Sequence, residues 1–126
     1  MDRAPRQQIE HYLQAYNAFD VAGMLRDLHP EVTFENIADG EVTLSLQGID
    51  AFRRQAEQAA QLFRQREQRI EGLRFEDDRA EVAIDYRGTL AVDLPNGLKA
   101  GDELKLKGKS VFRFEDGRII HIQDIS

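Results

Sequence analysis

Regular alternation between apolar and polar side chains dominates the second half of the chain. Between residues 80 and 92 every second residue except Gly88 is apolar, at Ala80, Val82, Ile84, Tyr86, Leu90 and Val92. A period of two places these side chains on one face of a β-strand. Shorter runs of the same kind cover residues 70–75, 104–114 and 119–125, with turn sequences between them. This half of the chain therefore predicts consecutive antiparallel strands with one buried face.

The first part of the chain has helical spacing instead. Intervals of three and four residues create one apolar stripe, formed by Ile9, Tyr12, Leu13, Tyr16 and Phe19. Asp20 is a predicted N-cap of a second, short helix that His29-Pro30 would end. Two strands are predicted at 32–37 and 42–47, followed by a third helix over 51–65. The predicted order is ααββαββββ, an α+β fold with the helices segregated from an antiparallel sheet of about six strands.

Composition and charge exclude several classes of function. The 126 residues predict one domain over residues 1–126, and the absence of cysteine excludes a disulfide framework and a cysteine nucleophile. The net charge of −6 argues against nucleic acid or an anionic membrane as the main partner. No apolar run approaches the roughly 20 residues of a membrane span. The first residues contain no apolar signal-peptide core, so a cytoplasmic protein is expected.

The orientation of the last predicted strand has two alternatives. A two-residue Asp116-Gly117 turn would place Ile119, His121 and Gln123 on the inner face. A three-residue turn with a bulge at Gly117 would place Ile120, Ile122 and Asp124 there instead. A slip of one residue moves every side chain to the other face, and the second register buries two isoleucines together. We therefore favour an inward Asp124, while His121 would be the leading base in the other register.

Several segments resemble the superfamily of nuclear transport factor two, ketosteroid isomerase, limonene epoxide hydrolase and the SnoaL-type polyketide cyclases. The resemblance is carried by residues 12–20, 29–36, 47–52, 87–89, 110–119 and 123–124. It implies a cone-shaped, cystatin-like fold. In that fold a strongly curved sheet wraps around the first helix and encloses an open-ended apolar pocket. One such fold serves many functions, so the resemblance specifies architecture better than activity.

Matching the residues one at a time to this superfamily separates the candidate mechanisms. Tyr12 corresponds to the oxyanion tyrosine of ketosteroid isomerase, but Asn36 replaces its base and Ser110 its protonated Asp. Asparagine cannot accept a proton at neutral pH, so steroid isomerisation by that mechanism is not expected. Asp124 corresponds to the acid near the end of the last strand in the epoxide hydrolases and cyclases. Arg87 and Thr89 are the nearest matches to the Arg and the second Asp of the hydrolase, but Thr89 cannot replace a carboxylate, so that triad is incomplete.

The candidate site contains residues from both ends of the chain. Asp124 is the predicted general base, because burial would raise its pKa, and Tyr12 is the second predicted catalytic residue. Ligand contacts are predicted for polar and aromatic residues on the expected inner faces, namely Tyr16, Phe34, Asn36, Tyr86, Ser110, Phe112 and Ile122. The three histidines have no metal-ligand spacing, so no metal and no cofactor are expected.

Two functions are consistent with these residues. The first is cofactor-free acid/base catalysis by Asp124 on a small hydrophobic carbonyl compound, as in a cyclase, isomerase or hydratase. The second is a non-catalytic module that binds a small apolar molecule or forms a homodimer. A modest dimer interface would use the predicted outer face of the sheet, with Ala83, Thr89, Val111, Ile119 and Ile125.

Overall fold

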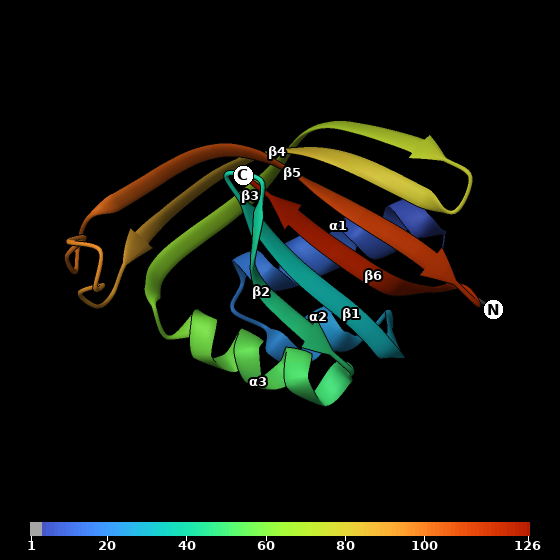
Figure 1. Cartoon of the computed structure of the whole chain (residues 1–126), viewed down its shortest axis with the longest axis horizontal. Helices are drawn as coiled ribbons and strands as arrows, with labels where there is room; N and C mark the ends of the chain where they lie inside the picture. The colour runs from blue at the N-terminus through green and yellow to red at the C-terminus, as the bar shows by residue number, and fades with distance from the viewer. Residues whose placement is uncertain (1–3) are drawn as a thin grey trace.

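The computed structural model describes residues 4–126 and contains three helices and six strands (Figure 1). In chain order they are α1 (Pro5–Asn17), α2 (Val21–Leu25), β1 (Leu28–Ala38), β2 (Glu41–Gln47), α3 (Ile49–Ala60), β3 (Phe63–Glu76), β4 (Arg79–Leu90), β5 (Glu103–Glu115) and β6 (Arg118–Ile125). The predicted α+β class and the order ααββαββββ are therefore confirmed.

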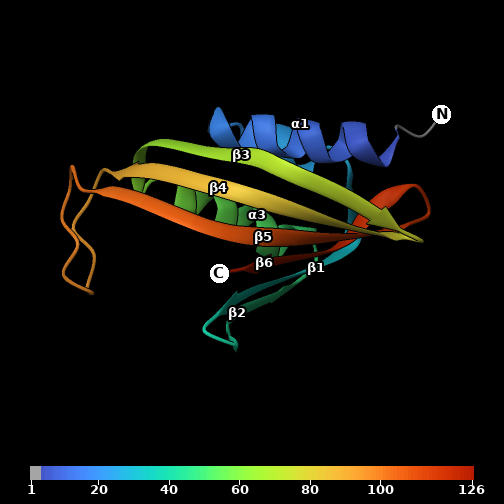
Figure 2. The same ribbon diagram turned by 90° about the horizontal axis from the view of Figure 1, so that it is seen from above.

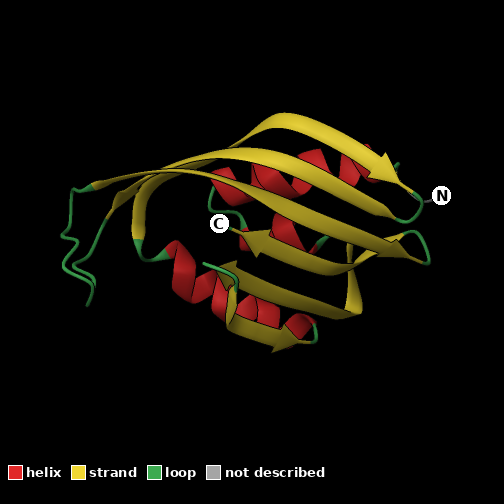
Figure 3. Ribbon diagram, turned by 45° about the horizontal axis from the view of Figure 1, so that its top comes forward, coloured by secondary structure: helices red, strands yellow, loops and turns green. Residues whose placement is uncertain are grey.

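The strands form one strongly bent sheet in the order β2-β1-β6-β5-β4-β3. Neighbouring strands are antiparallel except β1 and β6, which are parallel. Figures 2 and 3 show the sheet arching over the helices, so that the helices lie on its inner side. The parallel pairing of β1 with β6 brings the first and last strands of the chain together within the sheet.

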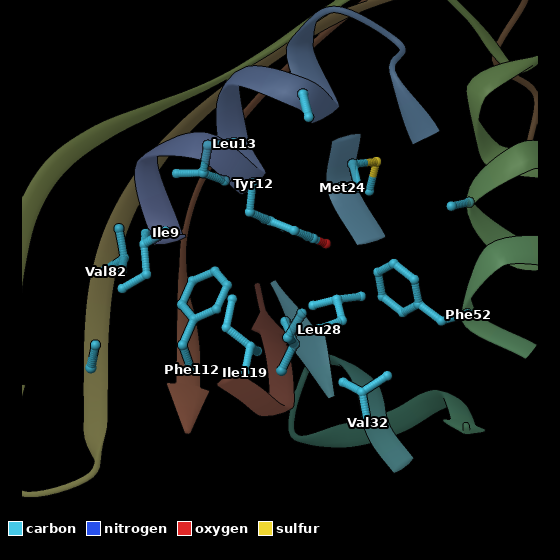
Figure 4. Close-up of a cluster of buried hydrophobic side chains, with 14 of the residues drawn as sticks. Ile9, Tyr12, Leu13, Met24, Leu28, Val32, Phe52, Val82, Phe112 and Ile119 are labelled. Carbon is cyan, nitrogen blue, oxygen red and sulfur yellow. The ribbon is translucent and has the colours of Figure 1, made fainter. Parts of the chain in front are cut away.

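The core lies between the inner face of the sheet and the three helices. Figure 4 shows Tyr12 from α1 between Phe112 of β5 and Phe52 of α3. The ring centroids of Tyr12 and Phe112 are 5.7 Å apart with nearly perpendicular planes, a favoured aromatic arrangement. The apolar stripe predicted on the first helix is therefore the face that the sheet covers.

The third helix and the strand after it differ from the prediction. The helix ends at Ala60 rather than near residue 65, and Phe63 already begins β3. The reason is long-range pairing, because β3 forms a ladder with the whole of β4, beginning with Phe63 opposite Leu90. Leu28, predicted in the second helix, is likewise the first residue of β1.

The last hairpin combines parts of both predicted registers. Glu115 pairs with Arg118, so the turn contains only Asp116 and Gly117, with φ of 54° and 74°. The predicted three-residue turn is therefore wrong. The register between β5 and β6 shifts after the first two pairs, because Phe114 pairs with Ile119 while Arg113 pairs with His121. A β-bulge of this kind inserts one extra residue into a strand and changes the face on which the following residues lie.

The bulge determines which side chains of β6 face inward. Ile119 is fully buried, and beyond the bulge Ile122 lies opposite Phe112. Asp124 faces inward as predicted, whereas Ile120 was wrongly predicted to do so, because it lines a hollow together with His121. His121 contacts Thr33 on the outer face instead of entering the core.

The predicted outer apolar patch is smaller than expected. Val111 and Ile119 were placed on it, but they are 1% and 0% exposed. Ile119 points into the core because the bulge follows it, and Val111 lies in the centre of the sheet between neighbouring strands. These two residues therefore contribute no surface to an interface.

Candidate functional site

Two cavities lie against the inner face of the sheet and share part of their walls. The first, of about 260 Å³, opens between β3, β4 and β5, and the second, of about 270 Å³, lies between α1, α3 and the β1–β2 pair. Tyr16, Asn36 and Asp124 line both cavities. These three residues therefore mark the junction between two mostly apolar cavities.

Asp124 is the acidic residue at this junction. Its neighbours across the sheet are Asn36 on β1 and Ser110 on β5, so three polar residues lie side by side on the inner face. Ser110 Oγ donates a hydrogen bond of 2.8 Å to Asp124 Oδ1. Burial raises the pKa of Asp124 to about 6, although the hydrogen bond from Ser110 opposes that shift. A carboxylate with such a pKa suits proton transfer near neutral pH.

Two tyrosine hydroxyls form a pair in the wall of the first cavity. Tyr16 from α1 and Tyr86 from β4 place their hydroxyl oxygens 2.9 Å apart. One hydroxyl donates to the other, so the second keeps its proton available for a ligand. Burial is the largest cause that raises the pKa of both groups, so both are protonated at neutral pH.

Tyr12 reaches the second cavity rather than the first. Figure 4 shows its hydroxyl pointing toward the space between Met24 and Phe52, and all three residues line that cavity. Burial and the negative charge of Asp124 raise the pKa of Tyr12 well above its usual value. Among residues 4–126 no side chain or backbone group hydrogen-bonds the Tyr12 hydroxyl, so it remains available as a donor.

The other predicted ligand contacts divide into two groups. Phe34 lines the second cavity, and Asn36 lines both while its amide donates a 2.8 Å hydrogen bond to Thr43 Oγ1. Phe112 and Ile122 are both 0% exposed and lie in the closed core. The structure thus brings seven of the nine predicted site residues to the cavities and keeps these two apart from them.

Several cavity residues were not among the predicted site residues. Phe63, Gln68, Leu104 and Leu106 line the first cavity, and Gln55 of α3 lines the second. The sequence pattern contained a signal for the leucines, because residues 104–114 were predicted as a strand with Leu104 and Leu106 on its apolar face. Phe63 and Gln68 had no such signal, since the start of β3 is a polar segment without alternation.

One surface cluster has a composition typical of metal ligands. His29, Glu115 and Asp116 have ligand atoms within 4.8 Å of one another. The backbone N–H of Glu31 donates a 3.0 Å hydrogen bond to His29 Nδ1, so the neutral ring carries its proton on Nε2. Nε2 is the nitrogen that faces Asp116, at 4.0 Å. A cation bound at Nε2 would require the other tautomer and would cost the hydrogen bond from Glu31, so this arrangement disfavours a metal ion.

No helix within residues 4–126 is both long enough and apolar enough to cross a membrane.

The family comparison agrees with the fold and with the predicted resemblance. The model of the SnoaL-like domain matches residues 9–122. The chain therefore belongs to the SnoaL-like domain family. Among curated proteins, none matches this chain.

Solved structures show the same architecture. A provisionally assigned polyketide cyclase from Xanthomonas campestris pv. campestris superposes with a TM-score of 0.82 at 19% identity, covering 96% of this chain and 88% of that one. For TsrD from Streptomyces laurentii the TM-score is 0.79 at 25% identity, with coverage of 98% and 89%. A protein with a ketosteroid isomerase-like fold from Catenulispora acidiphila, in complex with trimethylamine, gives 0.78 at 12% identity, with coverage of 97% and 85%. These similarities confirm the fold.

Proposed function

We propose that this protein is a cofactor-free acid/base catalyst that removes a proton from a small, mostly apolar carbonyl compound. The observation that carries the proposal is the position of Asp124, an acid with a pKa of about 6 at the junction of two apolar cavities. Membership of the SnoaL-like family supports a cyclase or isomerase type of reaction.

The proposed step is enolisation of the bound ligand. A carboxylate oxygen of Asp124 takes the proton from the carbon next to the carbonyl, so the C–H bond breaks and an O–H bond forms on Asp124. The electron pair moves to the carbonyl oxygen, which becomes an enolate. Hydroxyl groups supply the donors that such an oxygen needs, from the Tyr16–Tyr86 pair in the first cavity and from Tyr12 in the second. Later bond formation or reprotonation would depend on the particular ligand.

Hydrogen–deuterium exchange tests this step without knowledge of the natural substrate. A panel of small aryl ketones and 1,3-dicarbonyl compounds is incubated in D2O with the protein, and proton NMR follows the loss of the α-carbon signal. The wild type should accelerate exchange, and Asp124→Asn should reduce the acceleration at least about 100-fold. Asp50→Asn is the matched control, because Asp50 is exposed and pairs with Arg53 on the surface.

The competing function is a module that binds a ligand without chemistry. Saturable binding of panel compounds, with exchange no faster in the wild type than in Asp124→Asn, would establish that function and reject catalysis. A homodimer and a cytoplasmic location also remain predictions. Sedimentation velocity at micromolar concentration tests the first, because a purely monomeric protein would contradict it.

A further inference from the structure

Arg66 is a buried cation outside the predicted site. It is 5% exposed, and among residues 4–126 no acidic side chain forms an ion pair with it. Its Nε donates a 2.8 Å hydrogen bond to the backbone carbonyl of Tyr16, whereas its Nη2 is buried without a hydrogen-bond partner. Buried guanidinium groups usually face a carboxylate, so the positive charge of Arg66 is poorly compensated within the protein.

The guanidinium stacks on two aromatic rings, Tyr16 in the last turn of α1 and Phe19 just after that helix. Arg66 Cζ lies 3.7 Å from the centre of the Tyr16 ring and 4.6 Å from that of Phe19. Stacking of this kind stabilises a buried cation, but it leaves the net charge in place. It also holds the Tyr16 ring in a fixed orientation, with the hydroxyl directed at Tyr86.

The Tyr16–Tyr86 pair therefore has a positive charge on one side and the cavity on the other. Tyr16 and Asp124 both line that cavity, whereas Arg66 does not. The charge of Arg66 lowers the pKa of both tyrosines, against the larger effect of burial. A negative charge that develops on a ligand oxygen beside this hydroxyl pair would be stabilised by the same field.

We propose that Arg66, acting through Tyr16 and Tyr86, makes the cavity selective for ligands whose oxygen is bound as an anion. The class of ligand is an apolar enolate or phenolate, such as the enolate of a 1,3-dicarbonyl compound. Arg66 is a positioning residue, because it touches the Tyr16 ring and not the ligand. The inference rests on the proposed function and deepens it, since it identifies the ionised form that the site prefers.

Charge balance in the complex follows from the proton transfer. When Asp124 takes the proton from the ligand, the carboxyl group becomes neutral and the negative charge moves to the ligand oxygen. The cavity then holds one negative charge beside the tyrosine pair, with Arg66 behind it. Before the transfer, the same charge lies on Asp124, whose pKa is shifted by burial and Ser110, whereas the charge of Arg66 acts on Tyr16 and Tyr86. The arrangement therefore favours the product side of the transfer.

A pair of nitroaromatic probes of similar size and different charge tests this selectivity. The probes are 4-nitrophenol, whose phenolate absorbs visible light, and 4-nitroanisole, which cannot ionise. Binding is measured with the full-length Asp124→Asn protein, which removes the competing carboxylate. We expect the phenolate to bind about tenfold more tightly than 4-nitroanisole. Because this measurement does not use turnover, its failure is distinguishable from failure of the exchange experiment.

Substitutions of Arg66 in the same background complete the test. Arg66→Met should reduce phenolate affinity about tenfold and change 4-nitroanisole affinity less than about twofold. Arg66→Lys keeps the charge and should retain most of the phenolate preference. Equal losses for both probes in Arg66→Met, or no preference for the phenolate in the background protein, would overturn the inference.

A second variant keeps the inference falsifiable if Arg66→Met does not fold. Tyr86→Phe removes one hydroxyl of the pair and leaves Arg66 and the ring packing in place. We expect it to weaken phenolate binding several-fold with little effect on 4-nitroanisole. Unchanged phenolate affinity in Tyr86→Phe would mean that the hydroxyl pair does not bind the anion, which contradicts the inference.

Discussion

Ser110 on β5 lies directly opposite Asp124 on β6, and its hydroxyl donates a 2.8 Å hydrogen bond to the Asp124 carboxylate. Ser110 itself is buried, so this bond is shielded from water. A hydrogen bond donated to a carboxylate favours its charged form. Ser110 thus limits how far burial can raise the pKa of Asp124.

Removal of the Ser110 hydroxyl should therefore shift the pH dependence of proton exchange. In the wild type, exchange should increase as the pH rises through about 6, where Asp124 becomes a carboxylate. Ser110→Ala should raise the pKa of Asp124 and move that limb to higher pH. NMR exchange rates between pH 4 and pH 9 give both midpoints. The exposed Ser45 provides the control, since Ser45→Ala should leave the midpoint unchanged.

Asp124→Asn should change the pH dependence of stability in a defined direction. The pKa of Asp124 is raised from 3.8 to about 6 in the folded protein, so folding is opposed when this carboxyl group ionises. The variant should exceed the wild type in free energy of unfolding by about 1–3 kcal/mol above pH 6. The difference should disappear as the pH falls below 4. Urea unfolding at both pH values measures it, and an advantage that is larger in acid would contradict the burial of this carboxyl group.

Phe112 and Phe34 should respond differently to truncation. Phe112 is 0% exposed and packs edge-on against Tyr12, so Phe112→Ala should cost about 3–5 kcal/mol of stability. Phe34 is only partly buried and lines the second cavity, so Phe34→Ala should cost less. Calorimetry measures the loss of stability in each variant, and probe binding measures whether the cavity wall has changed. If Phe34→Ala lost more stability than Phe112→Ala, the assignment of Phe112 to the closed core and of Phe34 to the cavity wall would be contradicted.

Two glycines provide a matched pair for backbone packing next to the site. A Cβ atom at Gly108 would lie 2.6 Å from the carbonyl oxygen of Ile125, the residue after Asp124. Gly108→Ala should therefore displace the end of β6 and cost about 1–3 kcal/mol. At Gly72 the nearest atom to such a Cβ is 3.8 Å away, so Gly72→Ala should be almost neutral. Equal effects in chemical denaturation would argue against the close contact.

The local pattern of apolar residues was sufficient to predict the buried face where that pattern is regular over a long segment. The stripe that includes Ile9, Tyr12 and Leu13 is the buried face of α1, and the alternation from Ala80 to Leu90 is the inner face of β4. The start of β3 shows the limit of this approach. Residues 64–69 are all polar and read as helix or loop, yet they pair with β4 and bury Arg66 against α1. The strand structure of residues 64–69 and the burial of Arg66 depend on β4 and α1, which are distant in the sequence.

Residue patterns alone were enough to predict the α+β class, the order of the elements and most of the residues that face inward. These properties depend on periodicity within single elements, and that periodicity is local. That Asp124, Asn36 and Ser110 share one row, with His121 outside it, follows only from the folded sheet. The reason is that the register of β6 depends on a bulge stabilised by pairing with both β1 and β5. A shift of one residue exchanges the two faces of a strand, so the site exists only in the assembled sheet.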